Sequence, residues 1–320
     1  MVKQKYIIVS MRENGGGTLV LHNLCRLLND YGQDARILYC KNVHNECKRS
    51  VFIRDCLLYN IKVSVKYFLE GLLGSEKFRG YFDSPFRKTR RKFFPFVSKE
   101  TIVVYSEGMF GNPLHAGKVI RWLLLYNSIY KKHDNITIGY DINDLFFTYR
   151  KVFNDPVLNP ECKILYTPYY DMNLYKRYNY SKRNGKCYII RKGKWRVNEN
   201  DCKDGIIIDD LSEREKVRVF NECEYCISYD TQTIYTQIAA LCGCITVIVP
   251  ESGKGRSDYR KKDDAFYGEA FGFNTEEIEY ALSTAPLIEK QWRSENEESK
   301  RQVKDFIGVC EKYFNNERRN

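Results

Sequence analysis

Apolar and polar positions alternate along this chain in blocks whose lengths fit short strands and amphipathic helices. Apolar runs of four to six residues end in polar turns, and segments with apolar residues three and four positions apart follow many of them. This pattern predicts strands over residues 5–10, 35–39, 101–106, 136–140, 163–167, 187–190, 205–208, 225–228 and 245–249. It predicts helices over residues 19–28, 53–73, 115–130, 213–223, 234–241, 275–282 and 294–314.

A polar, tyrosine-rich stretch over residues 168–185 separates two blocks of this strand–helix alternation. We therefore predict an α/β fold with two Rossmann-like domains that face each other across a cleft. The first domain is expected to span residues 1–180. The second is expected to span residues 181–320 and to end in helices.

The most informative stretch runs from Glu224 to Glu251 and reads as strand, turn, helix and strand. The candidate binding residues in its turn are Tyr229, Asp230, Thr231 and Thr233. A helix that opens on Asp and Thr after a strand presents free backbone N–H groups and the positive end of its dipole, which suits a phosphate. The alternative is an ordinary βαβ unit with a capped helix.

A second candidate for anion binding follows the predicted strand 187–190. The chain continues with four cations around a glycine, in the run Arg191-Lys192-Gly193-Lys194-Trp195-Arg196, of which Arg191, Lys192, Gly193 and Lys194 are the predicted binding residues. Cationic side chains in a turn at the carboxyl edge of a parallel sheet are suited to a diphosphate. The alternative is a basic surface loop.

The first half opens with a glycine-rich turn between a strand and a helix. Gly15, Gly16 and Gly17 would let the backbone approach a ligand closely, although their spacing is not that of a dinucleotide-binding motif. A plain tight turn would explain these glycines equally well.

Three side chains in the first half are candidates for a general base. Glu107 follows a predicted strand, Asp141 follows another, and His115 lies in the first turn of the predicted helix 115–130. Asn112 is expected to cap that helix, with Pro113 at its first position. A solvated structural Glu and a capping His are the alternatives.

The stretch 224–251 resembles the nucleotide-sugar half of GT-B glycosyltransferases. The residues Ala240-Leu241-Cys242-Gly243 and the strand that follows match the family pattern, and Asp230 falls at its first acidic position. Ile238 occupies the second acidic position, where this chain departs from the family. Residues 111–113 and the later VIRWLL run are also similar to GT-B enzymes of bacterial surface-polysaccharide synthesis.

The resemblance implies transfer of a sugar from a nucleotide-sugar donor to a glycan or lipid-linked glycan acceptor. It implies that Arg191–Lys194 and Tyr229–Thr233 bind the donor, and that Gly15–Gly17 and Asn112 lie near the acceptor. A base from the first half, namely Glu107, His115 or Asp141, would act on the acceptor hydroxyl. The nucleotide sugar is a substrate, so no cofactor is expected.

The sequence predicts that the reaction does not use a metal. The chain has no Asp-x-Asp motif, which metal-dependent GT-A transferases use to hold the metal on the donor. Two cysteine pairs, 223/226 and 242/244, fall on regular elements rather than on zinc-binding turns.

Composition adds expectations about location and partners. The net charge of +11 indicates an anionic partner, and cations alternate with phenylalanines from Phe86 to Phe96. Such a run fits an anionic membrane surface, a single-stranded nucleic acid or a solvated loop, and we expect the membrane rather than nucleic acid. Twelve cysteines, no apolar run of membrane-spanning length and no signal peptide predict a cytoplasmic protein, peripheral on the inner face of the plasma membrane.

Two other classes of protein remain open from the sequence. The basic charge would also fit a nucleic-acid-binding protein. The missing second acid at Ile238 would fit a non-catalytic GT-B-like protein that binds a glycan or acts as a scaffold.

Overall fold

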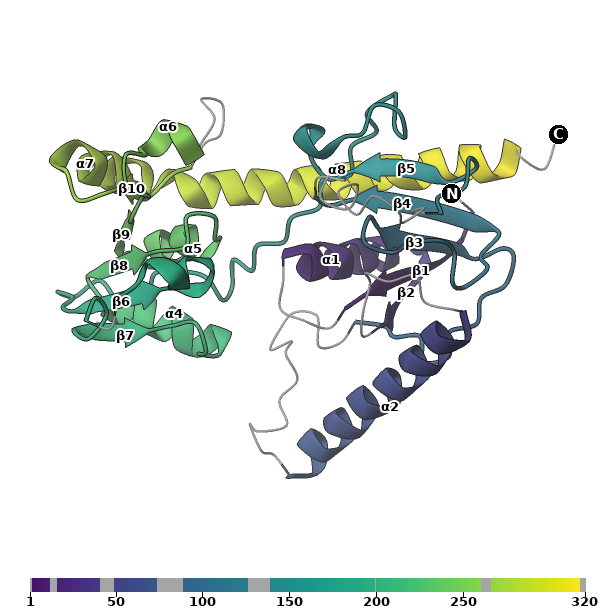
Figure 1. Cartoon of the computed structure of the whole chain (residues 1–320), viewed down its shortest axis with the longest axis horizontal. Helices are drawn as coiled ribbons and strands as arrows, with labels where there is room; N and C mark the ends of the chain where they lie inside the picture. Colours follow the sequence, from purple (N-terminus) through teal and green to yellow (C-terminus); the bar gives the residue numbers. More distant parts are fainter. Residues whose placement is uncertain are drawn as a thin grey trace. The chain divides into compact units, whose positions relative to one another are not determined.

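The computed structural model describes residues 2–11, 16–40, 49–73, 89–125, 139–198, 200–259 and 266–316. The chain forms two compact units (Figure 1). Unit 1 comprises Met1–Tyr169 and Glu295–Asn320, and unit 2 comprises Tyr170–Ser294. Each unit holds a parallel five-stranded sheet with helices, which confirms the predicted class of two Rossmann-like α/β domains.

The sheet of unit 1 has the strand order β2-β1-β3-β4-β5, and all its pairs are parallel. Its strands are β1 (Lys5–Ser10), β2 (Asp34–Tyr39), β3 (Ile102–Ser106), β4 (Lys118–Leu123) and β5 (Leu145–Thr148). Its helices are α1 (Gly16–Asp30), α2 (Arg49–Leu73) and the short 3-10 helix η3 (Lys151–Phe153).

Alternate residues of β1 enter different cores, because successive side chains of a strand point to opposite faces. Tyr6 and Ile8 pack in one cluster with α1, whereas Ile7 and Val9 pack in another with Phe52 of α2. The two helices therefore cover opposite faces of the sheet. This is the layering expected of a parallel sheet whose strands are apolar on both sides.

The last helix, α8 (Leu287–Asn316), contributes side chains to both units. Its beginning supplies Ile288 and Trp292 to the core of unit 2. Its later part supplies five buried side chains to the core that contains β1, namely Val303, Phe306, Ile307, Cys310 and Phe314. The structure thus divides the chain at residues 169/170 rather than 180/181, and the C-terminal residues belong to unit 1 rather than to the second domain.

The sheet of unit 2 has the order β10-β9-β8-β6-β7, again with parallel pairs throughout. Its strands are β6 (Lys186–Ile189), β7 (Gly205–Ile207), β8 (Tyr225–Ser228), β9 (Ile245–Ile248) and β10 (Glu269–Phe271). Its helices are η4 (Arg191–Arg196), α4 (Glu213–Glu222), α5 (Tyr235–Cys242), α6 (Arg256–Tyr259) and α7 (Thr275–Thr284).

Local sequence signals account for two helix ends in unit 2. Ser212 caps α4 by accepting a hydrogen bond from the Glu215 amide, and the Glu215 side chain accepts one from the Ser212 amide. This reciprocal pair is a capping box. Gly243 follows α5 with a φ of 102°, a left-handed conformation that glycine adopts without steric cost.

One predicted helix is wrong. The run that was expected to form the helix 115–130 contains the strand β4, which lies between β3 and β5. A strand covered on both faces is apolar at nearly every position, so its pattern does not distinguish it from a buried helix. Asn112 and His115 therefore do not begin a helix, and residues 126–130 of the prediction lie outside the described residues.

Other elements differ from the prediction more modestly. The strand β5 was not predicted, and residues 136–138 of the expected strand 136–140 lie outside the described residues. The expected strand 163–167 is a single bridge between Ile164 and Thr148. The helix α6 and the strand β10, which follow β9, were not predicted. No helix among the described residues is long and apolar enough to cross a membrane.

Candidate functional site

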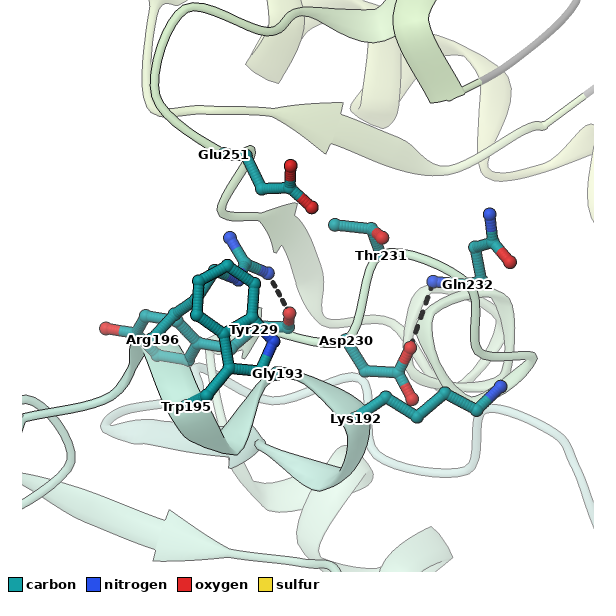
Figure 2. Close-up of a pocket in the computed structure, with 9 residues that line it drawn as sticks. All are labelled: Lys192, Gly193, Trp195, Arg196, Tyr229, Asp230, Thr231, Gln232 and Glu251. Carbon is teal, nitrogen blue, oxygen red and sulfur yellow. Dashed lines mark hydrogen bonds between the residues drawn. The ribbon is translucent and has the colours of Figure 1, made fainter.

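A pocket of about 120 Å³ lies at the carboxyl edge of the sheet in unit 2 (Figure 2). Three loops build it, and they follow β6, β8 and β9, which are neighbours in the sheet. Its lining residues are Lys192, Gly193, Trp195, Arg196, Tyr229, Asp230, Thr231, Gln232 and Glu251. The two turns that the sequence singled out for anion binding therefore meet in one pocket.

Gly193 and Arg196 hold these loops together. A Cβ atom at position 193 would overlap the backbone oxygen of Tyr229, so only glycine lets η4 lie against the turn after β8. The Arg196 guanidinium donates to the Val249 oxygen at 2.9 Å and also to the Tyr229 oxygen. The close contact at Gly193 and the two hydrogen bonds of Arg196 thus fix the relative positions of all three loops.

Asp230 is the most unusual side chain of the pocket. It is 2% exposed, and its Oδ1 accepts a hydrogen bond from the Gln232 amide at 3.0 Å. Its Oδ2 is buried without a hydrogen-bond partner among the described residues. Figure 2 shows Asp230 and Lys192 among the residues that line the pocket. An unpaired buried acceptor costs about 1–3 kcal/mol, so a hydrogen-bond donor that reached this oxygen would stabilise the site.

The remaining walls offer a cation, an aromatic ring and a second carboxylate. Lys192 is exposed, and the Trp195 ring is 76% exposed at the rim. Glu251 enters from the loop after β9, where it also pairs with Lys254. The pocket can therefore bind a ligand that carries negative charge, a flat ring and hydrogen-bond donors together.

Three residues predicted for this site do not line the pocket. Arg191 donates its backbone N–H to Asp209 at 2.7 Å and places its guanidinium over the Tyr235 ring. Lys194 is exposed on η4. Thr233 precedes α5, and its hydroxyl accepts a hydrogen bond from the Tyr235 amide at 3.3 Å.

The start of α5 corrects one expectation. The helix α5 begins at Tyr235 and does not open on Asp230 and Thr231, so these two residues form a turn ahead of it. The turn presents the Asp230 side chain to the pocket, whereas the sequence had indicated a bare helix terminus.

Sequence reasoning missed four lining residues: Trp195, Arg196, Gln232 and Glu251. Trp195 and Arg196 belong to the same basic run as Lys192, and the tight 3-10 turn brings them to the pocket. Glu251 is the first charged residue after β9, a signal that the edge-of-sheet argument would have found.

A second cavity, of about 260 Å³, lies in unit 1 at the carboxyl ends of β1, β3 and β4. Its lining residues are Val9, Ser10, Met11, Gly17, Thr18, Leu21, Ser106, Glu107, Gly108, Leu124 and Leu125. Glu107 is 6% exposed, and its Oε2 accepts a hydrogen bond from the Leu124 amide at 2.8 Å. Burial raises the pKa of this carboxyl to about 7. A carboxylate with a pKa near neutrality in a mostly apolar cavity has the properties of a general base.

A buried network supports the loop that carries Glu107. Arg121 is fully buried, pairs with Asp144 at 2.7 Å, and donates to the oxygens of Met109 and Gly111 at 3.0 and 2.7 Å. The Tyr140 hydroxyl donates to the Glu107 backbone oxygen at 2.9 Å. These bonds hold the loop after β3 in one conformation.

The other residues predicted in unit 1 have mixed placements. Gly16 and Gly17 open α1, and Gly17 lines the cavity, whereas Gly15 lies outside the described residues. Asn112 is tied to the backbone of Ala116 at 2.8 and 3.0 Å.

His115 and Asp141, the other predicted bases, are exposed in turns. His115 has a φ of 50°, and Asp141 accepts a hydrogen bond from the Asn143 amide. Neither residue lines the cavity, and neither does Asn112, so Glu107 is the one predicted base that does.

Among the residues that the structure describes, no group of three or more His, Cys, Asp or Glu side chains is placed to hold a metal ion. No protein-family model and no curated protein matches the sequence.

Several solved structures are similar to this chain over nearly its whole length. One is the glycosyltransferase SnogD from Streptomyces nogalater, with 10% identity, a TM-score of 0.41, and 96% of this chain and 100% of that chain covered. Another is a UDP-N-acetylglucosamine 2-epimerase, with 12% identity, a TM-score of 0.44, and coverage of 98% and 97%. A third is an α-glucosyltransferase solved with UDP and a 13-mer DNA, with 11% identity, a TM-score of 0.41, and coverage of 94% and 95%.

Proposed function

We propose that this protein is a metal-independent glycosyltransferase of GT-B type. It would move a sugar from a nucleotide-sugar donor to a glycan or lipid-linked glycan acceptor. The observation that carries the proposal is the unpaired, buried Oδ2 of Asp230 in the pocket of unit 2. Lys192 and the exposed Trp195 line the same pocket, at the sheet edge where α/β proteins bind ligands.

A nucleoside diphosphate has the chemical groups that these side chains would recognise. Lys192 would pair with the diphosphate, and the Trp195 ring would stack on the nucleobase. Asp230 would accept a hydrogen bond from a hydroxyl or N–H group of the donor. Arg191 and Lys194, on the same 3-10 helix, remain predicted contacts of the leaving diphosphate.

Glu107 is the base that we propose for the acceptor hydroxyl. In an inverting transfer, the acceptor oxygen forms a bond to the anomeric carbon while the bond to the diphosphate oxygen breaks. Glu107 takes the hydroxyl proton, and the cations near the donor site stabilise the leaving group. A carboxyl with a pKa of about 7 is substantially ionised at neutral pH, as this role requires.

The biological setting that we propose is surface-polysaccharide synthesis on the inner face of the plasma membrane. The motif 111–113 with the VIRWLL run supports this setting, as does the basic and aromatic segment 86–96. Phe94 and Phe96 are exposed there, whereas residues 86–88 lie outside the described residues.

Nucleotide binding tests this proposal directly. A thermal-shift screen against UDP, GDP, CDP and dTDP sugars should show selective stabilisation by one nucleotide. Titration calorimetry on Lys192→Ala should then show a Kd for that nucleoside diphosphate raised by roughly 10- to 150-fold, since a charge-assisted hydrogen bond contributes about 1.5–3 kcal/mol. Lys182→Ala, an exposed lysine of unit 2 outside the pocket, is the matched control.

The outcomes separate the competing functions. Stabilisation by none of the four nucleotides would refute a donor site in unit 2. Tight nucleotide binding without donor hydrolysis or transfer would instead support a non-catalytic GT-B-like protein.

A further inference from the structure

The helix α2 has apolar side chains on two opposite faces. One face packs on the sheet of unit 1, where Phe52, Cys56 and Val63 are buried. The other face carries five large apolar side chains, three and four positions apart, whose exposed fractions run from 47% to 67%. These residues, which we call the α2 stripe, are Leu58, Ile61, Val65, Phe68 and Leu72.

Unit 1 covers only the first part of this helix. No side chain of α2 that the structure describes beyond Val63 is buried. Figure 1 shows the second half of α2 extending away from the sheet. A surface helix normally has one apolar face, and one that is apolar on both sides needs a second covering. The α2 stripe therefore has the character of a contact surface.

The charges around the stripe are mainly positive. Lys62 and Lys66 each follow a stripe residue by one position, so they lie along one border of the stripe. Over its length α2 carries four cations and two acids: Arg49, Arg54, Lys62 and Lys66 against Asp55 and Glu70.

A second segment of unit 1 also combines basic residues with exposed apolar side chains. Residues 90–92 pair with the edge strand β2, because Ile37 donates to the Arg90 oxygen at 2.9 Å and Lys92 donates to the Ile37 oxygen at 2.8 Å. Phe94 and Phe96 follow and are exposed. Val97, the next residue, packs in the same core cluster as α2.

We propose that the α2 stripe is a docking surface for an anionic lipid bilayer, with Lys62 and Lys66 at the level of the headgroups. Apolar residues on one side of a helix with lysines along their border are the features of interfacial membrane helices. This inference rests on the membrane setting of the proposed function and names the surface that would contact the bilayer, but it does not depend on the donor pocket.

Charge favours a bilayer over a second copy of the chain. The stripe has the spacing of a coiled-coil seam, but in a stable seam opposite charges flank the apolar positions. Pairing two α2 helices would bring two predominantly positive surfaces together, whereas anionic lipid is complementary to both.

Vesicle co-sedimentation tests the proposal on the full chain. The wild type should bind vesicles of phosphatidylcholine with phosphatidylglycerol at least tenfold better than vesicles of phosphatidylcholine alone. The double variant Val65→Gln/Phe68→Gln should lower binding tenfold or more, while Val157→Gln/Phe273→Gln, at two exposed apolar sites elsewhere, should bind as the wild type does. Lys62→Gln and Lys66→Gln should each lower binding to the anionic vesicles about fivefold. The effect of each substitution should be smaller at high salt.

A depth measurement identifies the residues that enter the bilayer. Brominated lipids should quench the tryptophan emission of Phe68→Trp, whereas quenching in Phe273→Trp should not exceed that of the wild type.

Unchanged vesicle binding by a folded Val65→Gln/Phe68→Gln variant would overturn the proposal. A second result would also overturn it: a wild type that binds no vesicles but self-associates with rising concentration, where the Val65→Gln/Phe68→Gln variant does not self-associate. Nucleotide binding in the same variants reports separately on unit 2.

Discussion

Glu107 shows how one buried carboxyl can report on both activity and stability. If it is the base, kcat/KM should rise with pH and level off above about 7, because the carboxylate is the active form. Glu107→Gln should lower kcat about 10²-fold or more, with the Kd for the donor nearly unchanged. Steady-state kinetics across pH would measure both effects.

The matched control for this prediction is Asp141→Asn. Asp141 was also predicted as a base, but it is exposed and does not line the cavity. A near-normal kcat in Glu107→Gln together with a large loss in Asp141→Asn would reverse the assignment.

The same carboxyl should make the stability of the protein depend on pH. Its pKa is about 7 in the folded protein and near 4.5 when unfolded, so the folded state binds more protons between these values. The free energy of unfolding should therefore fall as pH rises from about 4.5 to about 7, by about 3 kcal/mol. Glu107→Gln should lack this decrease. Urea unfolding of wild type and variant at several pH values would measure the difference, and parallel curves would contradict it.

At the scale of elements, the contact between η4 and the turn after β8 should control nucleotide binding. Gly193→Ala places a methyl group against the Tyr229 backbone, which must move and take Asp230 with it. We expect the Kd for the nucleoside diphosphate to rise tenfold or more by calorimetry. Gly255→Ala, where a Cβ meets open space, should have no effect. Equal affinities in the two variants would show that the pocket does not bind the nucleotide.

Most elements could be predicted because their local signals agree with their packing. β8 matches its predicted bounds, and α4 and α5 end within a residue or two of theirs, since a capping box and a left-handed glycine mark their termini. β4 could not be predicted, because its central position in the sheet removes the alternation that identifies a strand.

The candidate site was predictable only in part, for a similar reason. Lys192, Tyr229 and Asp230 follow strands directly, so their place at the sheet edge follows from the sequence. Whether Arg191 points into the pocket depends on contacts with Asp209 and Tyr235, residues 18 and 44 positions away that no local pattern contains.

At the scale of the whole molecule, we expect sugar transfer to persist in excess EDTA. Lys192 lines the pocket of unit 2, where we propose that it pairs with the diphosphate, and the chain lacks an Asp-x-Asp motif to hold a metal on the donor. Transfer assays with chelator, and with Mg²⁺ or Mn²⁺ added back, would measure this. Activity that disappears with EDTA and returns with either metal would contradict it.

Truncation after Ser294 should unfold unit 1. It removes five buried apolar side chains of α8 from the core around β1, and each contributes about 1.5–3 kcal/mol by burial. Their sum is comparable to the 5–15 kcal/mol that stabilises a typical protein. Hydrogen exchange should show loss of protection in β1 and β3, whereas truncation after residue 316 should leave it unchanged. Protected β1 amides in the shorter chain would show that α8 is dispensable.

The two-part role of α8 also sets the order in which the chain can fold on the ribosome. The strands of unit 1 are made first, but their core is incomplete until Val303 and the residues after it have emerged. At about 5–20 residues per second, the nascent chain carries that open apolar face for on the order of 10 s while unit 2 is synthesised. The N-terminal half is therefore the part of the chain that we expect chaperones to bind during translation.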